Sequence, residues 1–251
     1  MDDMDLLIDL HGSALRQGPG SEADTLRAID LSGLSDKQDL KIADIGCGSG
    51  ASTLTLARTL DAQIVAVDFL PAFLTKLEDK AAAQGLSQRI TTLVASMDAL
   101  EFAPASLDAV WSEGAIYNMG FETGIKSWRP FLKPGGILAV SELTWLTSDR
   151  PAELTEHWSS EYAQVATASK KMAQLEAHGY VPVGYFPLPQ SSWLDTYYRP
   201  MQERFGDFLA RHGESVAAQS ILDAERHEIS LYERYAAFVS YGFYIARKRA
   251  D

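Results

Sequence analysis

Cysteine is almost missing from this sequence, and the histidines are few and scattered. Cys47 is the single cysteine among 251 residues, so the sequence offers no internal disulfide and no cysteine-based metal cluster. None of the five histidines stands in the H-x-x-x-H or a comparable spacing that is typical of metal ligands. The sequence therefore predicts a protein without a metal site.

Excess positive charge and long apolar runs are also absent. Acidic residues outnumber basic ones by 34 to 22 and give a net charge of −12, whereas nucleic-acid binding depends mainly on lysine and arginine. The one dense basic stretch, ARKRA at residues 246–250, is expected to be a solvated strand end. No stretch reaches the roughly 18 apolar residues that span a bilayer, and the first residues, MDDMDLLIDL, are acidic where a secretory signal is basic. We therefore expect a cytoplasmic protein with no nucleic-acid partner and no membrane span.

The most informative stretch is KIADIGCGSGAST, residues 41–53. A short apolar run of strand type ends at Ile45 and meets three glycines at alternate positions, Gly46, Gly48 and Gly50. Glycine permits positive φ and lets a ligand approach where a Cβ would collide. A helix that begins directly afterwards offers unpaired N–H groups. This pattern is typical of a turn that binds a nucleotide-like ligand.

Strand-type and helix-type segments alternate around and after this turn. Short apolar runs separated by helices are typical of βαβ units and of a parallel sheet that is buried on both faces. We expect strands at Ile42–Ile45, Ile64–Val67, Ile90–Ala95, Leu107–Ser112 and Ile137–Leu143, and helices at Ser52–Leu60, at Pro71–Gln84 and in a segment that ends near Leu132.

The second half of the chain departs from this rhythm. We expect a broken helical stretch over Pro151–His178, an edge strand in YVPVGYFPLP, helices over Tyr198–His212 and Glu214–Val239, and a last strand over Gly242–Arg247. Helices inserted after the fifth strand and before the last lie over the carboxyl edge of the sheet, where open α/β sheets bind ligands. The predicted fold is α/β, Rossmann-like and doubly wound, with a mostly parallel seven-stranded sheet, an antiparallel last strand and a helical cap over the carboxyl edge.

No linker divides the chain, so we predict a single domain over residues 1–251. It consists of an N-terminal helical lid (1–34), a cofactor-binding core (35–147) and the remaining sheet with its helical cap (148–251). In the lid, Asp5–Leu10 is expected to be a short amphipathic helix, and Ser21 to cap a second helix with Asp24 three residues on. The turn of Gly18, Pro19 and Gly20 between them fits a plain loop and a lid across the cofactor equally well.

Two ligand classes use a strand, a glycine turn and a helix with an acidic residue about 20 positions further on. Asp68 ends the second predicted strand, 20 residues after Gly48, and is placed to bind the ribose hydroxyls of an adenosine. The dinucleotide fingerprint asks for a third glycine at position 51, where this chain has Ala51. Asp44, two residues before the first glycine, is unfavourable beside a pyrophosphate and suits a ligand with an ammonium and a sulfonium. These charges favour S-adenosylmethionine over NAD.

ADIGCGSG resembles motif I of the class I S-adenosylmethionine-dependent methyltransferases, and the resemblance continues in order from Lys41 to Glu142. VAVDF resembles the second motif, ASMDAL the segment after strand three, LDAVWSEGAIYNMG the fourth motif and WRPFLKPGGILAVSE the strand-five motif. The details resemble most closely the small-molecule branch related to ubiquinone and menaquinone methyltransferases. RQGPGSEADTLRAI, before motif I, also resembles a segment found in bacterial members of that branch.

The resemblance implies an enzyme that moves the methyl group of S-adenosylmethionine to a small organic acceptor, such as an aromatic or quinone-like compound, and leaves S-adenosylhomocysteine. It places Asp68 on the ribose, Asp98 on the adenine amine beside Met97, and the RQGPGS segment near the methionine end. The predicted cofactor-binding residues are Asp44, Gly46, Cys47, Gly48, Gly50, Asp68, Phe69, Met97, Asp98, Glu113, Gln17, Gly18 and Ser21.

Such a reaction does not require a dedicated catalytic base, because the methyl group is already activated and positioning supplies much of the acceleration. If the acceptor is a phenol, an enol or an acidic carbon, a base would help. The predicted catalytic candidates are Glu113, His11 and Tyr117, with Glu142 as a further base. The predicted acceptor contacts are Tyr117, Trp145, Trp193 and Tyr197, although aromatic side chains also fill cores. Tyr232 and Tyr235 fit the core and a homodimer contact equally well.

Two other function classes stay open. One is an NAD(P)-dependent oxidoreductase, and the other is a methyltransferase fold that binds S-adenosylmethionine without catalysis, because a fold alone does not establish an activity. Enzymes that methylate base nitrogens or glutamine amides usually carry a proline-containing pattern after strand four, where this chain has SEGA at residues 112–115. A small-molecule acceptor is therefore the favoured reading.

Overall fold

The computed structural model describes residues 3–12, 14–213 and 215–250. Its centre is a mixed sheet in the order β3-β2-β1-β4-β5-β8-β7, with a two-residue strand, β6, paired to β5 beside this path. The strands are β1 (Leu40–Ile45), β2 (Ala62–Asp68), β3 (Ile90–Val94), β4 (Leu107–Glu113), β5 (Leu132–Trp145), β6 (Ala166–Thr167), β7 (Tyr180–Pro187) and β8 (Val239–Lys248). Strands β1 to β5 run parallel, and β8 is antiparallel to both of its neighbours, β5 and β7. The predicted doubly wound sheet with an antiparallel last strand is confirmed.

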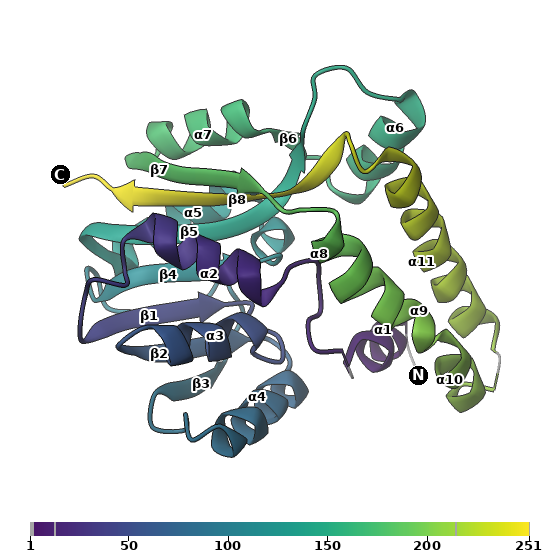
Figure 1. Cartoon of the computed structure of the whole chain (residues 1–251), viewed down its shortest axis with the longest axis horizontal. Helices are drawn as coiled ribbons and strands as arrows, with labels where there is room; N and C mark the ends of the chain where they lie inside the picture. The colour runs from purple at the N-terminus through teal and green to yellow at the C-terminus, as the bar shows by residue number, and fades with distance from the viewer. Residues whose placement is uncertain (1–2, 13, 214, 251) are drawn as a thin grey trace.

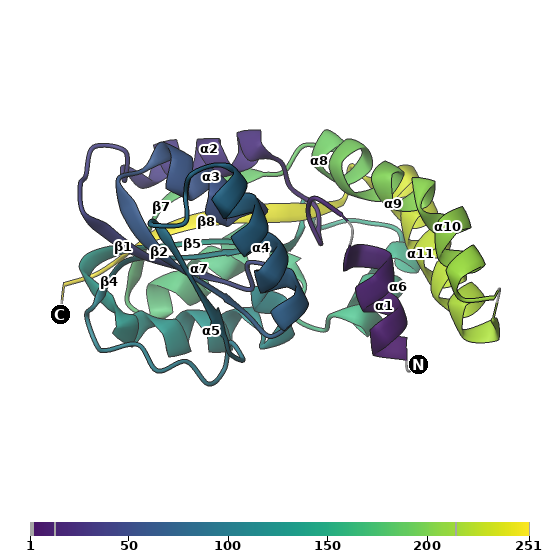
Figure 2. The ribbon, with the colours of Figure 1, turned by 90° about the horizontal axis from the view of Figure 1, so that it is seen from below.

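Helices cover both faces of this sheet (Figures 1 and 2). In Figure 2, α2 (Glu22–Ser32) and α3 (Ala51–Thr59) lie on one side, and α5 (Phe121–Trp128) and α7 (Ala168–Ala177) lie on the other. Helix α4 (Pro71–Ala83) packs against β2 and β3. The alternation of side chains along the strands explains the two layers: Ile42 and Ala109 belong to one buried cluster, and Ala43 and Val110 to the other.

A group of helices stands beyond the carboxyl edge of the sheet (Figure 1). It consists of α6 (Ala152–Glu161), the short run of α8 (Ser191–Trp193), η3 (Leu194–Tyr198), α9 (Arg199–Glu203) and α10 (Phe205–Arg211), and the long α11 (Val216–Tyr235). Figure 2 shows α1 (Asp3–Gly12) beside these helices, at the same end of the molecule. The predicted helical cap is present, and its helices are the ones inserted after β5 and between β7 and β8. None of the described helices is long and apolar enough to cross a membrane.

The N-terminal helix is fastened to the cap by side chains from opposite ends of the chain. Asp9 accepts hydrogen bonds from Arg211 at 2.7 Å and pairs with His212 at 2.8 Å. His11 Nε2 lies 3.4 Å from a carboxylate oxygen of Glu225 on α11. The Arg204 guanidinium donates to the carbonyl of Leu10 at 3.3 Å. Helix α1 is thus a fixed part of the cap.

Several boundaries differ from the sequence prediction. Strand β5 begins at Leu132, because Leu132 already pairs with Leu107 of β4; residues 133–136 form an irregularity before the pairing resumes at Ile137. The break expected in the helical stretch over Pro151–His178 is present, and β6 lies within it. The helix expected from Tyr198 begins earlier and is broken into α8, η3, α9 and α10. The predicted start of the following helix, Glu214, lies outside the described residues.

Candidate functional site

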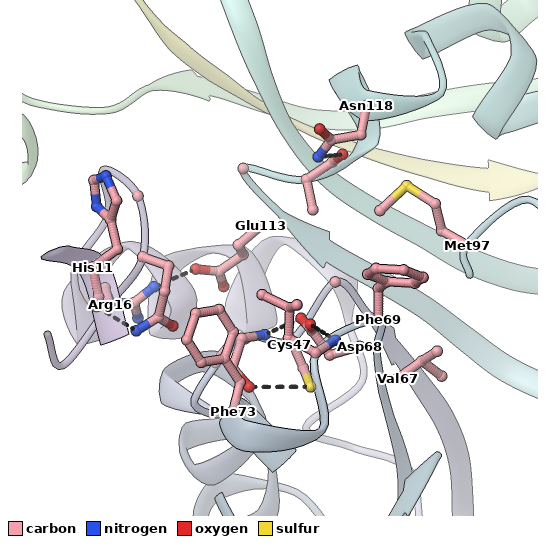
Figure 3. A pocket seen from close by; sticks show the side chains of 18 of the residues that line it. His11, Arg16, Cys47, Val67, Asp68, Phe69, Phe73, Met97, Glu113 and Asn118 are labelled. Atoms are coloured by element: carbon pink, nitrogen blue, oxygen red, sulfur yellow. Dashed lines mark hydrogen bonds and ion pairs between the residues drawn. The ribbon is translucent and has the colours of Figure 1, made fainter. Parts of the chain in front are cut away.

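A cavity of about 680 Å³ opens at the carboxyl edge of the sheet, between the strand ends and the cap (Figure 3). This volume is typical of a small-molecule or cofactor site. Its walls come from α1, the 16–19 segment, the glycine turn, the end of β2, the 95–98 segment, the residues after β4, and η3. The residues that line it and carry the argument below are His11, Arg16, Gln17, Gly18, Gly46, Cys47, Gly48, Asp68, Phe69, Met97, Asp98, Glu113, Tyr117, Asn118 and Tyr197.

The glycine turn forms the floor of this cavity. Gly46 and Gly48 line it, with φ angles of 71° and 54°. A Cβ on Gly48 would stand 2.3 Å from Oε1 of Gln17, so a larger residue would displace the Gln17 side chain from the turn. Gly50, also predicted to approach the cofactor, does not line the cavity. It begins α3, and a Cβ there would stand 2.1 Å from Cδ1 of Leu77.

Asp44 lies behind the floor, not in it. Its side chain is fully buried, and Oδ2 accepts hydrogen bonds from Ser52 at 2.8 Å and Thr53 at 2.7 Å. Oδ1 has no hydrogen-bond partner among the described residues. Burial raises the pKa of Asp44 to about 7, against the effect of the two hydroxyl donors. Asp44, predicted to bind the cofactor, does not line the cavity and instead accepts hydrogen bonds from the first turn of α3.

Asp68 ends β2 at the rim of the turn. Its carboxylate accepts the backbone N–H of Gly48 at 2.8 Å and that of Leu70 at 2.9 Å, which fixes its orientation. Burial raises the pKa of Asp68, and these backbone donors oppose the rise. Phe69, directly after it, is 70% exposed. An exposed phenyl ring on a cavity wall can pack against a planar ring of a ligand.

The opposite wall carries an ion pair that the sequence did not reveal. Arg16 donates to Oε2 of Glu113 at 2.7 Å, as Figure 3 shows, and to the hydroxyl of Thr25 at 3.1 Å. The other oxygen of Glu113 accepts from Thr25 at 2.8 Å and from Trp111 Nε1 at 2.9 Å. Both oxygens of Glu113 are therefore occupied. Glu113, predicted as a base, instead fastens the N-terminal segment to the end of β4.

Gln17 extends this fastening to the glycine turn. Its Oε1 accepts the backbone N–H of Ser49 at 2.8 Å, and its Nε2 donates to the hydroxyl of Ser49 at 3.2 Å. Gly18 and Pro19 line the cavity next to it, so the structure favours the lid over the plain loop for this segment. Ser21 lies outside the cavity, contrary to the prediction. It caps α2 through the N–H of Asp24, as its position in the sequence predicts.

Tyrosines and His11 form the end of the cavity that faces the cap. Tyr117 is 40% exposed, and its ring meets that of Tyr162 edge-on at 6.0 Å. His11 stacks on Tyr197, with ring centroids 6.1 Å apart and planes inclined by 15°. The structure thus brings together Tyr117, Tyr197 and His11, although they come from three distant parts of the chain.

Trp145 and Trp193, predicted to contact the acceptor, lie in the hydrophobic core. They are 4% and 1% exposed and do not line the cavity. Trp193 stacks on Tyr232 at 4.5 Å and donates to the hydroxyl of Ser240 at 3.0 Å. Their large apolar surface is used to join the cap to the sheet. Tyr232 is therefore a core residue, not a dimer contact.

Cys47 and the remaining polar groups of the cavity form neither a reactive nucleophile nor a metal site among the described residues. Burial raises the pKa of the Cys47 thiol, and the nearby Asp44 and Asp68 carboxylates raise it further, so the thiolate is disfavoured. Asp98 accepts a hydrogen bond from Ser96 at 2.5 Å on the cavity wall. Among the described residues, no group of three or more His, Cys, Asp and Glu side chains is arranged to hold a metal ion.

Comparison with known proteins agrees with this geometry. Residues 42–136 match the family model described as a methyltransferase domain. A 27-O-demethylrifamycin SV methyltransferase of Amycolatopsis mediterranei is 25% identical over 183 residues, which cover 69% of this chain and 67% of that protein. A sterol 24-C-methyltransferase of Aspergillus fumigatus is 28% identical over 114 residues, and the match covers 45% of this chain and only 30% of that relative.

A solved structure shares the fold over nearly the whole chain. The S-adenosylmethionine-dependent methyltransferase of Geobacter sulfurreducens, crystallised with S-adenosylhomocysteine, superposes with a TM-score of 0.85 at 16% identity and covers 98% of each chain. At this identity the likeness concerns the fold, which is the class I methyltransferase fold with its cap.

Proposed function

We propose, from the match of residues 42–136 to the methyltransferase-domain model, that this chain transfers the methyl group of S-adenosylmethionine to a small organic acceptor. The observation that carries the proposal is the cavity floor of Gly46 and Gly48, bounded by Asp68 on one side and by the Arg16–Glu113 pair on the other. An oxidoreductase that uses NAD(P) is not favoured. The narrower resemblance to quinone methyltransferases stays a prediction.

The residues on the walls fit the parts of S-adenosylmethionine. Asp68, oriented by two backbone N–H groups, would hold the ribose hydroxyls, and Phe69, Met97 and Asp98 would enclose the adenine. The amino-acid end of the cofactor carries one carboxylate and one ammonium. Arg16, which Glu113 and Thr25 hold on the wall, would face that carboxylate with its remaining N–H groups. The cofactor supplies a methyl group activated by its sulfonium.

The protein's contribution to catalysis is then mainly positioning. Glu113 has both oxygens engaged in hydrogen bonds. His11 pairs with Glu225 through Nε2 and keeps Nδ1 without a partner among the described residues, so of these two predicted bases only His11 would be able to accept a proton. Tyr117, Asn118 and Tyr197 would orient the acceptor at the cap end of the cavity, and the fixed α1 and the 16–19 segment would exclude water. A homodimer stays a prediction.

Binding of S-adenosylhomocysteine tests the cofactor. At a ligand concentration of 100 times Kd, binding would stabilise the folded state by about 2.7 kcal/mol, which raises Tm by roughly 5–10 °C for a domain of this size. The variant Asp68→Asn should weaken binding at least tenfold by calorimetry. Asp79→Ala, on the exposed surface of α4, is the matched control. Unchanged Tm with S-adenosylhomocysteine, together with enhanced fluorescence of NADH on mixing, would favour the oxidoreductase instead.

Transfer of a labelled methyl group tests the activity. The label should appear in the small-molecule fraction of a cell extract, and not in its protein or nucleic-acid fractions. Tight binding of S-adenosylhomocysteine without any labelled product would instead support a module that binds the cofactor without catalysis.

A further inference from the structure

The cap end of the cavity is walled by a connected set of tyrosine rings. Tyr197 lies beside Tyr198, with ring centroids 5.1 Å apart, and stacks on His11 on its other side. Tyr117 lines the same cavity and is in contact with Tyr162. Tyr241 stands directly beneath the segment after β4, since a Cβ on Gly114 would be 3.0 Å from its ring. Ring faces of this kind attract cations.

Carboxylates stand behind these rings. Glu228 on α11 accepts a hydrogen bond from the hydroxyl of Tyr198 at 2.7 Å, and Glu225, one turn earlier, faces His11 at 3.4 Å. Burial raises the pKa of Tyr197, and the nearby charges of Glu225 and Glu228 raise it further. Burial likewise raises the pKa of Tyr117, with further effects from Glu142 and Glu228. The two carboxylates of α11 thus lie in the layer behind the rings that line the cavity.

A third carboxylate lies at the base of this region. Glu142, on β5, is 1% exposed, and its Oε2 has no hydrogen-bond partner among the described residues. Its other oxygen is 3.8 Å from the ammonium of Lys171, which lies 4.5 Å from the centre of the Phe121 ring. Burial raises the pKa of Tyr162, and the negative charge of Glu142 raises it further. Glu142 therefore has its own cation in Lys171, and the described carboxylate at this end that pairs with no basic side chain is Glu228.

The basic groups nearby are already engaged. Arg204 donates to the carbonyls of Leu10 and Pro200, Arg16 pairs with Glu113, and Lys171 faces Glu142. Within the ranges that the structure describes, Glu228 and Glu225 pair with no lysine or arginine. Glu228 is only partly exposed, and its hydrogen bond among the described residues is with the neutral phenol of Tyr198, so it gains from a cation brought in by a ligand.

We infer that the methyl acceptor is a cationic amine whose ammonium group lies against Tyr117 and Tyr197, with Glu228 as its main counter-charge. The inference rests on the proposed function and specifies its substrate class. A neutral acceptor of the same shape would leave Glu228 without a positively charged partner, so the site should discriminate strongly between the two.

The reaction balances for such an acceptor. A protonated amine first loses its proton to water in the cavity, because Glu228 does not line the cavity itself. The nitrogen lone pair then forms the new N–C bond while the S–C bond breaks and its electron pair stays on sulfur. The products are S-adenosylhomocysteine and the methylated ammonium, whose charge Glu228 balances from behind the tyrosine rings.

The test uses the whole chain saturated with S-adenosylhomocysteine and a pair of probes of equal shape, choline and 3,3-dimethyl-1-butanol. Choline should bind at least tenfold more tightly by calorimetry or NMR titration. The variant Glu228→Gln should reduce that preference to less than threefold and leave the affinity for S-adenosylhomocysteine unchanged. Glu233→Gln, an exposed position of the same helix, should change neither affinity.

The outcomes separate this inference from the proposed function. Equal binding of the two probes, failure of both to bind, or an unchanged choline affinity in Glu228→Gln would each overturn the cationic acceptor. Failure of S-adenosylhomocysteine to bind the wild-type protein would overturn the proposed function first. If Glu228→Gln unfolds, Glu225→Gln provides the second test, and it too should weaken choline alone.

Discussion

Substitution of Gly50 by alanine tests how tightly the glycine turn is built. Gly50 has φ of 85° and ψ of 24° and begins α3. A Cβ there would stand 2.1 Å from Cδ1 and 2.9 Å from Cγ of Leu77, a residue of α4 that is fully buried. The neighbour cannot swing into solvent, so α3 and α4 would have to move apart.

The expected loss has two parts. A residue with a Cβ costs about 1–2 kcal/mol in the left-handed region, and an extra methyl group forced into a packed core costs about 1–3 kcal/mol more. Gly50→Ala should therefore lower the free energy of unfolding by about 2–5 kcal/mol. Gly33 provides the matched control, because its φ is 66° and a Cβ there would meet nothing within 4 Å. Gly33→Ala should lose only the backbone part, about 1–2 kcal/mol.

Urea unfolding at 25 °C measures both losses, with unchanged m values as the sign that the two-state comparison is valid. Gly50→Ala should also weaken binding of S-adenosylhomocysteine, because displacement of α3 moves the turn that lines the cavity, whereas Gly33→Ala should leave binding unchanged. Equal losses of stability in the two variants would refute the argument, because the clash with Leu77 would then contribute nothing to the free energy of unfolding.

Three further predictions concern buried charges. Because the pKa of Asp44 in the folded state is about 7 against an ordinary 3.8, the native state keeps the proton more strongly and stability falls as pH rises from 4 to 7. Asp44→Asn should therefore match the wild type near pH 4 and exceed it by up to about 4 kcal/mol at pH 8 in urea titrations, and a constant difference across that range would contradict the assignment. Lys171→Met should lose about 3–5 kcal/mol because it leaves Glu142 buried without a cation, whereas the double variant with Glu142→Leu should recover most of that loss. A double variant as unstable as the single one would show that the pair does not act as a unit. Arg16→Ala should weaken calorimetric binding of S-adenosylhomocysteine about 10- to 100-fold but leave that of methylthioadenosine, which lacks the amino-acid end, within twofold, and parallel losses would place Arg16 elsewhere on the cofactor.

The sequence was most informative where the chemistry is local. The alternation around Ile42 and the glycines from Gly46 to Gly50 lie within one short stretch, and they predicted both the sheet and the ligand-binding turn. Asp68 followed from its fixed spacing after the turn. The Arg16–Glu113 pair was missed because the two residues are 97 positions apart in the sequence. Neither of them lies in a local sequence pattern that predicts an ion pair.

The acceptor end was predicted least well, for a related reason. Aromatic side chains are equally suited to a core and to a binding wall, so the sequence alone did not separate Trp193, which is 1% exposed, from Tyr117, which is 40% exposed. The difference depends on which face of the cap each residue occupies. That face is set by breaks such as the one at η3, where a stretch of π-helix interrupts the expected regular helix.

The fastening of α1 to α10 and α11 has a consequence for how the protein is made. Asp9 and Arg211 are 202 residues apart, and such distant contacts form late because a long loop must close before they are gained. A chain that emerges from the ribosome in order can pair β1 to β5 and form the glycine turn while the cap is still unsynthesised. We therefore expect the methyl-donor half of the cavity to form first and its acceptor half to be completed only when α11 has docked, so that a nascent chain can hold its cofactor before it can recognise a substrate.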